Sequence, residues 1–167
     1  MINKIEKAIL TMLWIGYFKY APGTAASFIT CLIFYIHPMG GIELYVLFFL
    51  IVMTIYAVIL IDKVYKKEDS EEIVIDEFVG QSIPLIAWYF RADFFGLTLP
   101  HGFWLSSYLF EFWIVASFIL FRIFDIIKPF PINIVDKKIK NGLGVMLDDI
   151  IAGIYSTIIL YIIYLLV

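Results

Sequence analysis

The sequence predicts an all-α membrane protein, a polytopic helical bundle of about five spans with short interfacial helices. Hydrophobic residue types make up 63% of the 167 residues and charged types 16%, whereas soluble domains are nearer one half and one quarter. The mean hydropathy is +0.96. Several apolar runs approach the length of about 20 residues that crosses a bilayer. We expect one membrane-embedded domain over residues 1–167.

The first part of the chain is expected to form one interfacial helix and two spans. Residues 3–18 set lysines and a glutamate among apolar residues, which is typical of an amphipathic helix lying in the membrane interface. Pro22 and Gly23 end this helix. Residues 24–36 are apolar but short for a bilayer, and turn residues follow them. Residues 42–61 have the length of a complete span.

The remaining apolar runs predict three further spans. Residues 73–90 contain Pro84, which bends a helix but is accommodated within a membrane bundle. Residues 103–127 form the longest run, and prolines directly after it prevent the helix from continuing. Residues 132–140 suit a short amphipathic surface helix. Residues 145–167 form the last expected span.

The lysines predict the orientation of these spans. Lys63, Lys66 and Lys67 follow the second span, and a second group of lysines from Lys128 to Lys140 lies two crossings further on, hence on the same side. By the positive-inside rule this side is cytoplasmic. The arrangement requires the short segment 24–36 to cross the membrane, because otherwise the two lysine groups would face opposite sides.

Charge and cysteine content exclude two classes of site. The net charge of −3 excludes a strongly basic nucleic-acid surface, so we expect no nucleic-acid partner. Cys31 is the single cysteine and lies within an apolar run. The sequence therefore predicts neither a disulfide framework nor a thiolate zinc site.

The predicted topology brings several acidic residues to the cytoplasmic ends of different spans. A charge at membrane depth costs on the order of a few kcal/mol unless it has a partner. Oxygen ligands of this kind favour magnesium or manganese over zinc. Neighbouring helical residues point about 100° apart, so we expect different roles within each adjacent pair. The predicted metal-binding and catalytic residues are Asp76, Glu77, Asp125, Asp148 and Asp149.

Plainer interpretations of these acids stay open at this point. Acidic residues at the start of a helix suit the helix dipole and are often solvated. Arg122 and Asp125 are three residues apart, so they can form a structural ion pair along one helix face.

Small residues on the same side are candidates for binding a phosphate group. Thr24 and Ser27, at the start of a helix, offer hydroxyls and free N–H groups to an anion. Gly142 and Gly144 would let backbone N–H groups approach a phosphate. All four are equally interpretable as ordinary helix caps.

Four segments, at residues 21–27, 73–80, 121–131 and 142–153, together resemble the phosphatidylglycerophosphatase A family. They read Ala-Pro-Gly-Thr-Ala-Ala-Ser, Ile-Val-Ile-Asp-Glu-Phe-Val-Gly, Phe-Arg-Ile-Phe-Asp-Ile-Ile-Lys-Pro-Phe-Pro and Gly-Leu-Gly-Val-Met-Leu-Asp-Asp-Ile-Ile-Ala-Gly. Asp136 also fits the pattern. The chain departs from it at Asn141, where the family tends to have glycine, and in the bulkier segment before Pro22.

The resemblance implies a magnesium-dependent lipid phosphatase of the bacterial inner membrane, acting in glycerophospholipid biosynthesis. Its reaction is hydrolysis of phosphatidylglycerophosphate to phosphatidylglycerol and phosphate at a cytoplasmic site. In this hypothesis the five acids hold Mg²⁺ against the phosphate, and Arg122 and Lys128 join Thr24 and Ser27 in binding it. The alternative is a membrane protein that binds or transports divalent cations. The sequence does not determine the oligomeric state.

Overall fold

The computed structural model describes residues 3–37, 41–64, 72–95 and 103–166, and every regular element within them is a helix. The all-α class is therefore confirmed. The elements are α1 (Lys4–Leu10), η1 (Ile15–Tyr17), α2 (Pro22–Ile36), α3 (Glu43–Val64), α4 (Ile75–Phe95), α5 (Phe103–Ile127), α6 (Ile132–Lys138) and α7 (Gly142–Leu166).

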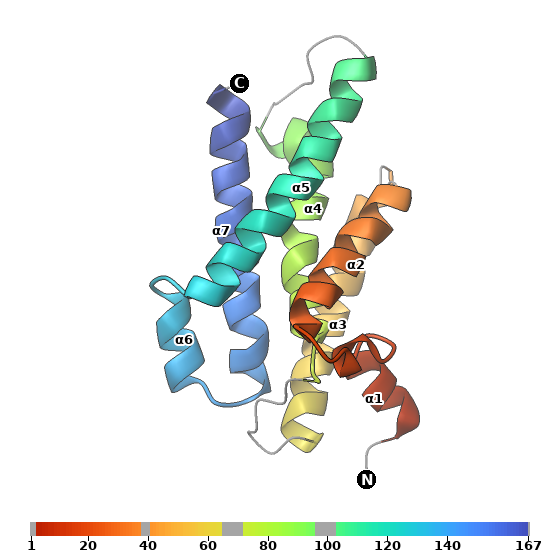
Figure 1. The fold of residues 1–167 in the computed structure, drawn as a ribbon, viewed down its shortest axis with the longest axis vertical. Coiled ribbons are helices and arrows are strands. Elements are labelled where there is room, and N and C mark those ends of the chain that lie inside the picture. The colour runs from red at the N-terminus through yellow and green to blue at the C-terminus, as the bar shows by residue number, and fades with distance from the viewer. Residues whose placement is uncertain (1–2, 38–40, 65–71, 96–102, 167) are drawn as a thin grey trace.

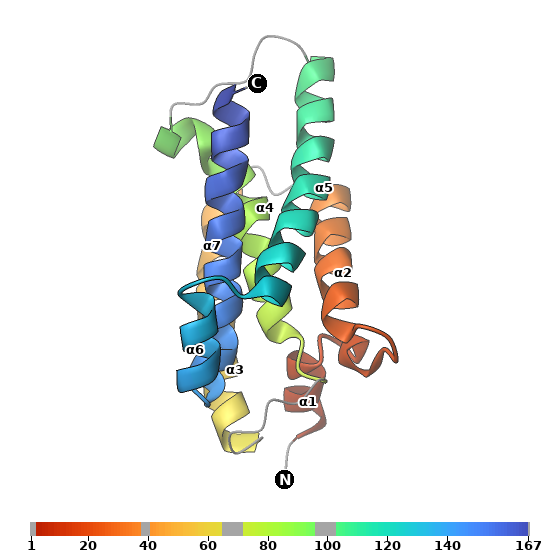
Figure 2. The ribbon, with the colours of Figure 1, turned by 60° about the vertical axis from the view of Figure 1, so that its left-hand side comes forward.

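The five longer helices run along the long axis of the molecule, as Figures 1 and 2 show. Helix α7 packs against α3, α4, α5 and α6, and α4 also contacts α2 and α3. The short helices α1 and α6 lie toward the end of the bundle that carries the N-terminus, opposite the C-terminus (Figure 1). The starts of α2, α4 and α7 meet the end of α5 near this end.

Two glycines bring α4 and α7 into close contact. A Cβ atom on Gly153 would overlap the backbone carbonyl oxygen of Gly80, and one on Gly80 would lie 2.7 Å from the carbonyl oxygen of Asp149. Small residues permit this backbone approach between membrane-type helices. The contact places Asp149 of α7 beside the first turns of α4.

The helix expected over residues 3–18 is broken, and that prediction was wrong. Helix α1 ends at Leu10, and Met12, Leu13 and Trp14 follow with φ values of 46°, 54° and 72°. The Thr11 hydroxyl donates to the Lys7 carbonyl oxygen over 2.9 Å and accepts from the Trp14 N–H over 3.1 Å. Such a side chain competes with the helical hydrogen bonds of the backbone.

The last helix begins three residues before its expected start at 145. The Asn141 side chain accepts a hydrogen bond of 3.1 Å from the Gly144 N–H, which is the usual geometry of an N-cap. The Gly142 N–H donates to Asp62, which lies in α3 beyond the end expected at residue 61. The side chains of Asn141 and Asp62 therefore stabilise the start of α7, which the apolar pattern alone does not predict.

Two helices among the described residues are long and apolar enough to cross a membrane, Glu43–Lys63 and Gly142–Leu166. The helix Pro22–Ile36 is apolar but shorter. The prediction of about five spans is not confirmed, although a helix occupies most of each expected segment. The exposed faces of α3 and α7 carry many large apolar side chains, which is typical of association with a membrane.

Candidate metal and phosphate site

A cavity of about 290 Å³ opens where the starts of α2, α4 and α7 meet the end of α5 and α6. Apolar and glycine residues form part of its wall, and charged side chains form the rest. The charged residues that line it are Asp76, Glu77, Arg122, Asp125, Lys128, Asp136, Lys140, Asp148 and Asp149. All five acids predicted from the sequence therefore line one pocket.

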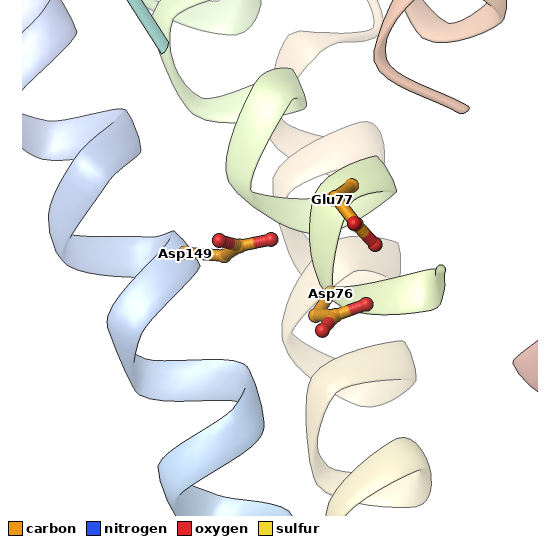
Figure 3. Close-up of side chains that lie close together, drawn as sticks. All are labelled: Asp76, Glu77 and Asp149. Atoms are coloured by element: carbon orange, nitrogen blue, oxygen red, sulfur yellow. The ribbon is translucent and has the colours of Figure 1, made fainter. Parts of the chain in front are cut away.

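Three of these acids form a compact carboxylate cluster. One carboxylate oxygen each from Asp76, Glu77 and Asp149 lies within 4.8 Å of the others. Figure 3 shows Asp149 pointing from α7 toward the two side chains of α4. Asp76 Oδ1 and Glu77 Oε2 are buried, and neither has a hydrogen-bond partner in the part of the chain that the structure describes. Because buried anionic oxygens are costly without compensation, the cluster suits a bound cation.

The two adjacent acid pairs differ in a way that the helical geometry did not predict. Asp148 and Asp149 separate as expected, since Asp149 joins the cluster while Asp148 accepts from Lys128. Asp76 and Glu77, however, converge on the same cluster, contrary to the separate directions that helix geometry predicted for them. They lie in the first turn of α4, where the longer Glu77 side chain reaches the same space.

Lys128 links three helices at one side of the pocket. Its Nζ atom donates to Asp136 Oδ1 of α6 over 2.7 Å and to Asp148 Oδ2 of α7 over 2.8 Å. Burial alone would lower the pKa of the Lys128 ammonium, but these bonds outweigh burial and raise it. The hydrogen bond from Lys128 likewise lowers the pKa of Asp136. Lys128 has φ 47°, a strained conformation for a residue other than glycine.

Arg122 places a partly paired guanidinium at the pocket. Its Nη1 lies 2.8 Å from Asp125 Oδ2, an ion pair that lacks the alignment of a hydrogen bond. Arg122 Nε and Nη1 are buried without a hydrogen-bond partner among the described residues. A Cβ on Gly23 would overlap Glu77 Oε1 and lie 3.3 Å from Arg122 Nη1, so only glycine leaves room for both side chains.

The other residues suggested for phosphate lie elsewhere or are already bonded. Thr24 and Ser27 do not line the pocket, and the Ser27 hydroxyl donates to the Gly23 carbonyl oxygen within α2. The N–H groups of Gly142 and Gly144 donate to side-chain oxygens of Asp62 and Asn141. A phosphate in the pocket would therefore meet side chains before backbone N–H groups.

Two residues at or near the site could not be found from charge patterning. Asp136 was noted only through the family resemblance, since it lies in a lysine-rich segment that resembles any solvated helix. Asp62 belongs to the polar run after an expected span, and only the tertiary structure shows that it binds the start of α7.

The fold and the pocket define a membrane-associated helical protein with a carboxylate cluster of the metal-binding type. The chain belongs to the phosphatidylglycerophosphatase A family, whose sequence profile matches residues 8–164. The family predicted from the four segments is thus confirmed. No solved structure matches the chain with significance.

Three relatives illustrate this membership. The chain is 43% identical over 93 residues to phosphatidylglycerophosphatase A of Haemophilus influenzae, covering 56% of this chain and 46% of that protein. It is 40% identical over 93 residues to the Escherichia coli K12 protein of the same name, covering 56% and 44%. The chain thus matches less than half the length of each of these two relatives.

The third relative matches over most of both chains. It is a Bacteroides thetaiotaomicron protein named provisionally as a phosphatidylinositol-3-phosphatase, 32% identical over 157 residues. The match covers 87% of this chain and 84% of that protein. The relatives therefore carry the names of two different phospholipid phosphatases.

Proposed function

We propose that this protein hydrolyses phosphatidylglycerophosphate to phosphatidylglycerol and phosphate in phospholipid biosynthesis. The observation that carries the proposal is the carboxylate cluster of Asp76, Glu77 and Asp149, set in one pocket with the guanidinium of Arg122, whose Nε has no hydrogen-bond partner within the described part of the chain. Family membership supports the substrate class, because two relatives bear the name of this activity.

Asp76, Glu77 and Asp149 would hold the metal ion. Three carboxylates with two orphaned oxygens offer the oxygen ligands that Mg²⁺ prefers, and nitrogen or sulfur ligands are absent from the described pocket lining. A magnesium ion bound there would supply positive charge against the phosphate oxygens and acidify a bound water. Asp125 and Asp148 would complete the acidic wall of the pocket. Asp125 would position Arg122, and Asp148 would pair with Lys128.

Arg122 is the principal phosphate ligand in this proposal. Its Nε donor has no hydrogen-bond partner among the described residues and can bind a phosphate oxygen, while Asp125 pairs with Nη1 and holds the guanidinium in place. Lys128 already donates to two carboxylates, so it orients Asp148 and adds positive charge near the phosphate. Water attacks phosphorus while the ester P–O bond breaks; a pocket carboxylate accepts the proton of the attacking water and passes it to the oxygen of the leaving alcohol.

The arrangement of helices supports the multi-pass topology. We infer that α2, α3, α4, α5 and α7 all cross the bacterial inner membrane within a single domain over residues 1–167, with the pocket on the cytoplasmic side. The contact between Asp62 and Gly142 places the end of α3 beside the start of α7, so Lys63 lies at the same end of the bundle as Lys128. Lys66 and Lys67 lie outside the described residues.

A second candidate substrate is phosphatidylinositol 3-phosphate. The relative that matches most of this chain carries that activity in its provisional name. Both lipids present a phosphate monoester on a diacylglycerol-linked headgroup, so the same cluster and arginine would serve either reaction. The two substrates differ in the headgroup that must fit the pocket.

The test is phosphate release by the purified full chain from each lipid, with Mg²⁺ or with excess chelator. Asp149→Asn should lower the rate about a hundredfold or more, as removal of a group that stabilises the transition state does. Glu111→Gln makes the same kind of change at an exposed position outside the pocket and should leave the rate unchanged. Full activity of Asp149→Asn, or full activity in chelator, would contradict the metal site. Magnesium binding without phosphate release would instead favour a cation-binding protein.

A further inference from the structure

An apolar groove lies next to the acidic pocket, between the N-terminal segment and α2. One wall comes from the segment around η1 and the other from the first turns of α2. The groove is open to the outside, and its lining includes Trp14, Ile15, Tyr17, Phe18, Ala25 and Phe28. Several of these aromatic side chains are largely exposed, with Phe18 at 59% and Phe28 at 58%. The groove therefore offers an apolar surface to a ligand.

The groove and the acidic pocket share one stretch of chain. Ala21, Pro22 and Gly23 line the acidic pocket, and they connect Phe18 to Ala25, which line the groove. The start of α2 thus has charged side chains on one side and apolar side chains on the other. A ligand that joins a phosphate group to a hydrocarbon chain matches this arrangement.

Backbone strain shapes the aromatic wall of the groove. Met12, Leu13 and Trp14 are three consecutive residues with left-handed φ values, which cost about 1 to 2 kcal/mol each in residues other than glycine. The Leu13 N–H donates to the Ala8 carbonyl oxygen over 2.7 Å and stabilises the turn. This turn ends α1 and directs the chain into η1, where the aromatic residues lie against α2.

The composition of the segment suits the boundary between lipid headgroups and acyl chains. Tryptophan and tyrosine collect at this depth because their rings are apolar and their edges are polar. The Lys7 ammonium lies 5.2 Å from the centre of the Tyr17 ring, so a cation stands beside the aromatic wall. The ligand that fits the groove is therefore an acyl chain whose headgroup lies on the side of the acidic pocket.

We propose that this groove binds the upper part of one acyl chain of the lipid whose phosphate occupies the acidic pocket. The proposal rests on the proposed function, since that function supplies the phosphate end of the ligand. The groove makes the diacyl lipid a better substrate than its headgroup alone, because chain and phosphate bind on two sides of the same α2 turn. Ala25 and Phe28 then help to determine substrate preference.

Filling the groove tests this proposal. Ala25→Trp places a large ring within it, and Leu32→Trp adds the same ring two turns further along the same face of α2, at an exposed position outside the groove. Each purified variant is assayed in detergent with long-chain phosphatidylglycerophosphate and with its deacylated, water-soluble headgroup. We expect Ala25→Trp to lower kcat/KM about tenfold for the long-chain lipid, as loss of apolar contact to about two methylene groups would.

The headgroup alone should be hydrolysed equally well by wild type and both tryptophan variants, and Leu32→Trp should behave as wild type on both substrates. Equal losses on the lipid and on the headgroup would overturn the proposal, because the ring would then disturb the acidic pocket. Equal losses in Ala25→Trp and Leu32→Trp would also overturn it, because general contact with detergent would explain them.

A binding measurement separates this proposal from the proposed function. A phosphonate analogue of the lipid, which resists hydrolysis, carries a photoreactive group in one acyl chain, and diacylglycerol with the same chain is the control. The phosphonate should label residues 14–18 and 25–29 several-fold more than diacylglycerol does. Equal labelling by the two lipids would overturn the groove proposal even in an active enzyme, whereas selective labelling would support it even if phosphate release fails.

Discussion

The carboxylate of Asp62, near the end of α3, accepts a hydrogen bond of 2.6 Å from the backbone N–H of Gly142, the first residue of α7. A carboxylate suits the positive end of a helix dipole and satisfies one of its free N–H groups. Gly142 permits the approach, because a Cβ there would lie 2.5 Å from the Val58 carbonyl oxygen. Helix α3 therefore positions the start of the helix that carries Asp148 and Asp149.

Asp62→Ala should destabilise the protein by about 1 kcal/mol, the usual effect of losing a helix cap. For a chain of this size that corresponds to a melting temperature lower by about 2–4 °C, measured by thermal unfolding in detergent. Asp62→Asn keeps an acceptor oxygen, so its melting temperature should fall by less than that of Asp62→Ala. Ile59→Ala, at an exposed position about one turn earlier in α3, is the control; an equal loss there would mean that the contact with α7 is not the cause.

Gly23→Ala should lower phosphatase activity about tenfold or more while leaving thermal stability nearly unchanged. The new methyl group would displace the Glu77 carboxylate, which is the mobile tip of a side chain, and alanine itself favours the helix by about 1 kcal/mol. Activity and melting temperature of the same preparation check this separation. In a double variant, Glu77→Asp shortens the acid and removes its overlap with the new methyl group. The double variant should therefore be as active as Glu77→Asp alone. A further loss in the double variant would contradict displacement of Glu77.

Arg122→Gln should lower kcat/KM about a hundredfold, because it removes the charged donors that face the pocket. Arg122→Lys should retain part of the activity, since it keeps the charge but loses the forked geometry. Ser27→Ala is the matched comparison: its hydroxyl is bonded to Gly23 within α2, so activity should change little. A loss in Ser27→Ala as large as that in Arg122→Gln would restore the phosphate role predicted for Ser27.

Asp136→Asn should destabilise the protein at neutral pH by weakening the bridge to Lys128. The pKa of Asp136 is lowered by the hydrogen bond from Lys128, so the ionised carboxylate stabilises the folded state fully above its ordinary pKa of about 3.9. This stabilisation is lost as the pH falls through the lower folded value. The difference in melting temperature from wild type should therefore shrink in acid.

Lys138→Gln is the control for Asp136, because it changes an exposed charge on the same helix. A difference between wild type and Asp136→Asn that stays constant over the whole pH range would show that the ionised carboxylate is not responsible. Magnesium titration of both variants should leave metal binding intact, because neither residue belongs to the carboxylate cluster.

The broad organisation could be predicted from the sequence because it depends on composition and on local signals. Apolar run length predicted the main helices, and the prolines after residue 127 predicted the end of α5. The lysine pattern predicted that the acids lie at one end of the bundle, and all five line one pocket. Magnesium and the individual site roles stay predictions.

The partners of the charged side chains could not be predicted in the same way. The convergence of Asp76 with Glu77 depends on side-chain reach in the first turn of α4. The two carboxylates bound by Lys128 come from α6 and α7. Periodicity describes the direction of a residue on its own helix and carries no information about which atoms of other helices it meets.

The helical class, the family and the acids that meet at one end of the bundle could be inferred from residue types in their order along the chain. The partners of the last acid pair depend on the tertiary structure: Asp149 joins the α4 acids, whereas Asp148 accepts a hydrogen bond from Lys128. The reason is the close contact of α4 and α7 at Gly80 and Gly153, which sets the distance between two segments far apart in sequence.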